Sequence, residues 1–104
     1  MYSRITLLEI DTLRFDLTTL RERFERDVVP GLSELDGYCG VIAQTTPEGK
    51  AVLVSLWETQ EALDAAAPFA SEALSNFATA FRSPPGRESY EVVYADLAHA
   101  TVEV

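Results

Sequence analysis

Hydrophobic and polar positions change their spacing along the chain and predict alternating strands and helices. Residues 2–10 form a run of β-favouring residues and predict a first strand. Apolar residues then recur at spacings of three and four from Leu17 to Leu35, while arginines and glutamates occupy the other positions. This spacing predicts an amphipathic helix with a solvated charged face. Asp16 can cap its start, and Pro30-Gly31 should end or bend it.

The middle of the chain predicts a hairpin. Residues 37–46 and 50–57 are two β-rich runs around the short segment Pro47-Glu48-Gly49. Thr59 then stands where it can cap a second helix. Pro68 should break or kink that helix, which resumes through Leu74, Phe77 and Phe81.

A loop at residues 83–86 precedes the last predicted strand, Ser89 to Leu97. The tail from His99 to Val104 could add a short strand or pair with another chain. The resulting order, β-α-β-β-α-β, predicts a ferredoxin-like α+β fold with a four-stranded antiparallel sheet and both helices on one face. With 104 residues and 11.5 kDa, the chain is expected to form one domain, residues 1–104.

Side-chain alternation separates the two faces of the predicted sheet. We assign the small and aliphatic sets to the helix side and the aromatic sets to the open side. The sets assigned to the helices are Val52, Val54 and Leu56; Cys39, Val41 and Ala43; and Glu91, Val93 and Ala95. The sets assigned to the open side are Ala51, Leu53, Ser55 and Trp57; Tyr38, Gly40, Ile42 and Gln44; and Tyr90, Val92 and Tyr94.

An open face with these aromatic side chains would be a larger exposed apolar patch than soluble monomers usually carry. A second copy of the chain is the simplest cover, so the pattern predicts a homodimer. Trp57 is then expected on the open face, mostly buried, in contact with Tyr90 and Tyr94 across the interior or from the partner.

The composition excludes some classes of binding partner. Lys and Arg total 8 against 17 Asp and Glu, a net charge of −9, which argues against nucleic acid and anionic membrane surfaces as partners. Cys39 is the only cysteine, and no signal peptide or transmembrane segment is evident, so a cytoplasmic location is expected. One histidine and one cysteine give no metal-ligand cluster.

Three segments, "VVPGLSELDGYCGV", "VLVSLWETQEALDA" and "YEVVYADL", resemble the dimeric α+β barrel superfamily, and within it the antibiotic-biosynthesis-monooxygenase-like domains. The resemblance implies a barrel of two paired sheets, with a pocket in each protomer between sheet and helices or toward the dimer interior. Members of that family include cofactor-independent oxygenases of phenols or quinols and haem-degrading enzymes.

The haem-degrading members use a histidine on the second helix and an asparagine on the first strand. Here residues 59–82 contain no histidine and residues 2–10 no asparagine, while the only histidine is His99. Haem is therefore disfavoured, and we expect no cofactor. In the polyketide-oxidising members an asparagine is expected four positions before the tryptophan, where this chain has Leu53.

Candidate ligand-binding residues follow from the aromatic face. Trp57 could stack on an aromatic ligand and donate its indole N–H, or could simply fill the interior. Arg4 could neutralise an anionic substrate or form a surface salt bridge. The other candidates are Tyr38, Tyr90, Tyr94, Ser55 and Gln44.

Three functions remain open at this stage. The first is an oxygenase, without metal or flavin, that acts on a phenol- or quinol-type molecule. The second is a non-catalytic module that binds a small apolar or aromatic molecule. The third is a structural or regulatory dimer with a packed interior.

Overall fold

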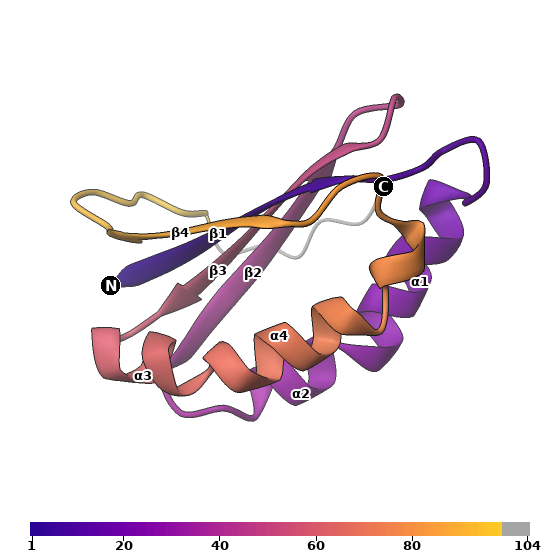
Figure 1. The fold of residues 1–104 in the computed structure, drawn as a ribbon. Coiled ribbons are helices and arrows are strands. Elements are labelled where there is room, and N and C mark those ends of the chain that lie inside the picture. The colour runs from indigo at the N-terminus through magenta and orange to yellow at the C-terminus, as the bar shows by residue number, and fades with distance from the viewer. Residues whose placement is uncertain (99–104) are drawn as a thin grey trace.

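The computed structural model describes residues 1–98 and contains one antiparallel sheet with all helices on one of its faces (Figure 1). The strands are ordered β2-β3-β1-β4 across the sheet, as expected for the ferredoxin-like fold. Their bounds are Tyr2–Glu9 for β1, Tyr38–Thr45 for β2, Lys50–Trp57 for β3 and Gly86–Glu91 for β4. The predicted tail strand and His99 lie outside the described residues.

Each predicted helix is divided in two near its proline. The helices are α1 (Leu17–Asp27), α2 (Val29–Ser33), α3 (Gln60–Ala65) and α4 (Ala67–Ser75), followed by a short 3₁₀ turn, η1 (Ala78–Ala80). Pro30 and Pro68 lie in the first turns of α2 and α4, where a missing N–H breaks no helical hydrogen bond. Both predicted breaks are therefore confirmed.

The predicted caps are also confirmed. The backbone N–H of Thr19 donates to Oδ2 of Asp16 at 2.9 Å, at the start of α1. This bond lowers the pKa of the Asp16 carboxyl, because it stabilises the charged form. At the start of α3, the N–H of Ala62 donates to Oγ1 of Thr59 at 3.1 Å.

The last strand lies earlier than the predicted range Ser89–Leu97. Strand β4 pairs with β1 from Gly86 opposite Leu7 to Glu91 opposite Tyr2. One further bond, from the Val92 N–H to the Met1 oxygen, reaches the first residue of the chain. The β-favouring residues after Val92 are not part of the strand, which ends at Glu91.

The face assignment of β3 was wrong. Ala51 and Trp57 are buried, and they face the helices together with Leu53 and Ser55, whereas the Val52, Val54 and Leu56 set lies on the open face. Side-chain size and shape are a poor guide here, since the helix face has to line a cavity and the open face carries the aliphatic side chains.

Strand β2 has an irregularity near its start that changes which of its side chains face the helices. The pairing with β3 shifts between Tyr38, opposite Trp57, and Gly40, opposite Leu56, so one extra residue lies on β2. Cys39 sits in this irregularity and is exposed, contrary to the prediction that it is buried under the helices. After the shift, Val41 pairs with Ser55 and shares its face.

The core under the helices consists of two clusters, one toward each end of the sheet. The first contains the buried residues Leu8, Ile10, Leu20, Ala51 and Ala80. The second contains Val28, Leu32, Trp57, Leu63 and Ala66. No helix within residues 1–98 has the length and apolar character needed to cross a membrane.

Gly37 closes the turn that joins α2 to β2, and we expect Gly37→Ala to lower stability. Its φ is +79°, and a Cβ there would lie 2.5 Å from the Cβ of Ala62 in α3. The strained backbone alone should lower the free energy of unfolding by about 1–2 kcal/mol. Urea unfolding would measure this. Gly86→Ala is the control, because its Cβ would make only an ordinary contact with Leu7 at 3.8 Å. Equal stability of the two variants would contradict the prediction.

Candidate functional site

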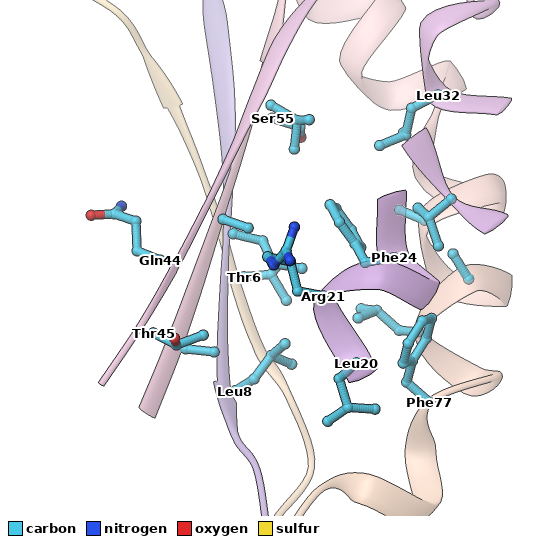
Figure 2. A pocket seen from close by; sticks show the side chains of 18 of the residues that line it. Thr6, Leu8, Leu20, Arg21, Phe24, Leu32, Gln44, Thr45, Ser55 and Phe77 are labelled. Carbon is cyan, nitrogen blue, oxygen red and sulfur yellow. The ribbon is translucent and has the colours of Figure 1, made fainter. Parts of the chain in front are cut away.

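A cavity of about 530 Å³ lies between the helix-facing side of the sheet and helices α1, α2 and α4 (Figure 2). This volume is within the range of pockets that hold small molecules. Most of its lining is aliphatic or aromatic, as such pockets usually are. The aromatic lining residues are Phe24, Trp57, Phe69, Phe77 and Phe81.

Trp57 stands at one end of this cavity, under the helices. Only 2% of its surface is exposed, and it belongs to the second core cluster with Val28, Leu63 and their neighbours. The ring of Tyr38 meets it edge-on, with ring centroids 5.8 Å apart and an angle of 75° between the planes. The expectation that Trp57 is mostly buried is confirmed, but its predicted contact with Tyr90 and Tyr94 is wrong.

The indole N–H of Trp57 donates to Oγ of Ser55 at 3.0 Å. Ser55 lies two residues earlier on the same face of β3, so strand geometry brings the two groups together. Since a hydroxyl can accept this bond and still donate its own proton, Ser55 can offer an O–H to a ligand. Both residues line the cavity. The pair is thus a candidate site for a ligand oxygen.

Arg4 lines the same end of the cavity from β1. Its Cα partner on β3 is Ser55, and its Nη2 donates to the backbone oxygen of Leu63 in α3 at 3.2 Å. Burial lowers the pKa of the guanidinium, the charge of Arg87 lowers it further, and Asp64 acts in the opposite direction. Among residues 1–98 the ion pairs do not include Arg4, so the predicted surface salt bridge is absent there.

The other candidates do not gather around the cavity. Gln44 borders it, but Figure 2 shows its side chain pointing away, because the shift in β2 places it on the opposite face. Tyr38 packs against Trp57 without lining the cavity, and burial raises the pKa of its phenol. Tyr90 lies on the open face opposite Ser3, 48% exposed. Tyr94 follows β4 and is 81% exposed.

Four polar lining residues, Thr6, Thr18, Arg21 and Thr45, were not among the candidates. Thr6 is buried on β1 two residues after Arg4, so strand alternation from Arg4 could have identified it. Arg21 lies between Leu20 and Phe24 on α1, and its side chain extends into the space between α1 and the sheet (Figure 2). The charged residues Glu22 and Arg23 follow it, so in the sequence it resembles the solvated face of the helix.

No group of three or more histidine, cysteine, aspartate or glutamate side chains is placed to hold a metal ion within residues 1–98. The cavity lining, as far as the structure describes the chain, contains none of these four residue types. The polar groups that face the cavity are hydroxyls, guanidinium groups and the indole N–H. Such groups can bind and orient an oxygen-bearing ligand, but they do not supply a general base near neutral pH.

No protein-family model matches the chain, and no curated protein matches it in sequence. Solved structures do match, and they show that the fold is that of the antibiotic-biosynthesis-monooxygenase-like α+β domains.

A Nitrosomonas europaea protein provisionally assigned as an antibiotic biosynthesis monooxygenase has a TM-score of 0.71 and 16% identity, over 90% of this chain and 100% of that one. The monooxygenase from the ActVA-Orf6 gene of Streptomyces coelicolor, solved with nanaomycin D, has a TM-score of 0.70 and 18% identity, over 93% and 91%. The haem degrader MhuD of Mycobacterium tuberculosis, solved with two haems in its active site, has a TM-score of 0.67 and 20% identity, over 94% and 100%.

We expect Trp57→Phe to lower the free energy of unfolding by on the order of 1 kcal/mol, because it leaves a void and removes the bond to Ser55. Urea unfolding followed by circular dichroism would measure the change without needing tryptophan fluorescence. Tyr94→Phe is the control, since it alters an exposed aromatic ring. Wild-type stability of Trp57→Phe would mean that the indole is not a packed part of the core.

Proposed function

We propose that this protein binds a small, flat aromatic molecule in the cavity and oxidises a phenol- or quinol-type substrate there without a cofactor. The observation that carries the proposal is the cavity itself, which combines apolar and aromatic walls with the hydroxyl of Ser55 held by Trp57. The likeness of the fold to a monooxygenase solved with nanaomycin D supports it.

The proposed chemistry uses the substrate as its own reductant. A quinol reacts with O₂, one oxygen atom enters the ring, and the other leaves as water together with the two hydrogens that the substrate loses. The product is a hydroxyquinone, and the atoms balance without an added electron donor. The protein orients the substrate, and donors such as Ser55 and Arg4 stabilise negative charge on its oxygens.

A non-catalytic binding function is the second candidate, and one observation favours it. No aspartate, glutamate or histidine among the described residues lines the cavity. An oxygenase with this lining must receive a substrate that loses its proton to water. A binding protein has no such requirement.

Incubation with 1,4-dihydroxynaphthalene under ¹⁸O₂ tests the oxidation. We expect the product to be 2-hydroxy-1,4-naphthoquinone with one ¹⁸O atom, in the added hydroxyl group. Mass spectrometry should detect more of this labelled product than in a reaction without protein. Ala73→Trp, which places a large ring in the cavity wall, should reduce the labelled product to the background level. Binding of the quinol by calorimetry without labelled product would instead establish the non-catalytic function.

We further propose that the open face of the sheet is covered by a second copy of the chain. Large apolar side chains are exposed on it, and more follow after β4. The exposed residues on this face are Leu7, Ile42 and Tyr90, and those after β4 are Val93, Tyr94 and Leu97. A patch of this kind usually marks an interface.

Sedimentation equilibrium at low micromolar concentration should give twice the mass of 11.5 kDa. Leu7→Asp should shift the protein to the monomer, because Leu7 is 46% exposed in the single chain and a charge there opposes only the pairing of two sheets. Thr46→Asp, in the exposed hairpin loop, should leave the mass unchanged. A stable wild-type monomer would refute the proposed dimer.

A further inference from the structure

The two core clusters are separated on the sheet by polar side chains. Arg4 and Thr6 on β1 and Ser55 on β3 lie on the helix-facing side, between Trp57 at one end and Leu8 and Ala51 at the other. We call Arg4, Thr6, Ser55 and, across from them on α1, Arg21 the polar belt of the cavity. A row of polar groups in the middle of a core is costly unless those groups have partners.

The charge of the cavity is opposite to that of the chain. The whole sequence has 17 acidic residues against 8 basic ones, yet the described lining contains Arg4 and Arg21 and no carboxylate. Arg87 also contributes positive charge near Arg4, as its effect on the pKa of Arg4 shows. Its Nη1 donates to Oγ of Ser71 at 2.8 Å, which holds it between β4 and α4. A positive interior in an acidic protein indicates an anionic ligand.

Arg4 has unused hydrogen-bonding capacity. A guanidinium has five N–H donors, and within the described residues Arg4 uses one of them, on the neutral oxygen of Leu63. Half-buried charges are normally compensated by an opposite charge. Asp64 acts on Arg4 from a greater distance, beyond the ion pairs found. The fork of donors that remains matches the two oxygens of a carboxylate.

The positive charge of Arg21 is partly compensated by Glu25. Its Nη1 bonds Oε2 of Glu25 at 2.8 Å, one turn along α1, and both side chains are partly exposed. A single contact of this kind occupies one nitrogen and leaves the others free. Arg21 therefore adds positive charge on the helix side of the cavity, while Arg4 supplies the less compensated group on the sheet side.

We propose that the aromatic ligand of this cavity carries a carboxylate, which Arg4 binds and Arg21 attracts from the opposite wall. The proposal rests on the proposed aromatic-binding function and specifies the class of its ligand. The ring system lies toward the apolar end formed by Leu8, Leu20 and Phe77. The carboxylate lies at the polar belt, where Ser55 can donate to one of its oxygens.

The experiment compares 2-naphthoate with 2-naphthamide, which have the same rings and differ in charge. Isothermal titration calorimetry gives the Kd of each, and the single indole N–H signal of Trp57 in a ¹H–¹⁵N spectrum reports occupation of the cavity. We expect 2-naphthoate to bind at least about tenfold more tightly, as charge-assisted hydrogen bonds allow.

Variants of the two arginines test which side chain binds the carboxylate. Arg4→Gln should weaken 2-naphthoate binding by about tenfold or more and change 2-naphthamide binding by less than about twofold. Arg21→Gln should have the same selectivity with a smaller effect. Arg26→Gln is the matched control, because it removes one positive charge from the same helix at an exposed residue paired with Asp27 and should change neither Kd. Arg4→Lys, which keeps the charge without the fork, should recover part of the affinity.

The possible outcomes test the carboxylate assignment and the aromatic-binding function separately. Equal affinity for the acid and the amide would overturn the carboxylate assignment and leave the aromatic-binding function standing. Equal weakening of both ligands by Arg4→Gln would assign Arg4 a structural role and would also overturn it. Failure of both compounds to shift the Trp57 signal would refute the aromatic-binding function itself. The comparison of acid and amide on the wild type needs no variant, so a misfolded Arg4→Gln protein would not prevent the test.

Discussion

The packing of Trp57 between the end of β3 and the helices is the constraint on which the cavity depends. The indole contacts residues of α2 and α3 in one cluster and meets Tyr38 of β2 edge-on. It thereby joins the segments that enclose one end of the cavity. Its only polar atom is satisfied by Ser55, so the ring is buried without an unpaired donor. Because the same bond orients the Ser55 hydroxyl, the packing of the core and the polarity of the cavity have a common origin.

The helix side of the sheet is not a continuous apolar surface. In this respect the region around the cavity differs from an ordinary packed core. Small side chains such as Ala43 and Ala51 on the strands and Ala70 and Ala73 on α4 leave space between the two layers. Larger rings, including Phe24 and Phe77, border that space (Figure 2). A protein that only needed stability would fill such a gap, since dispersion contacts are lost across it. Retention of the gap together with polar side chains favours a ligand over a purely structural role.

The sequence was sufficient for the order of elements, since that order depends on local signals. Asp16 and Thr59 cap helices, Pro30 and Pro68 interrupt them, and Gly49 lies in the hairpin loop, each through interactions within a few residues. The bounds of β4 were misplaced because they depend on its pairing with β1, which is distant in the sequence. Arg21 was missed as a cavity residue for a related reason, since only the packing of α1 on the sheet distinguishes it from its charged neighbours.

The exchange of faces on β3 shows why residue size alone misleads in this type of sheet. Val52, Val54 and Leu56 suggested a surface under helices, yet β-branched side chains on a pleated surface suit sheet-to-sheet packing equally well. The helix face of β3 instead carries Ala51, Leu53, Ser55 and Trp57, which line the cavity. This mixture of sizes and polarities leaves space between the sheet and the helices. An aliphatic open face suited to a second sheet and a mixed helix face suited to a ligand then give the two sides of one sheet different functions. The proposed dimerisation and the proposed ligand binding are therefore separable, because the side chains that would serve them alternate along the same strands and point in opposite directions.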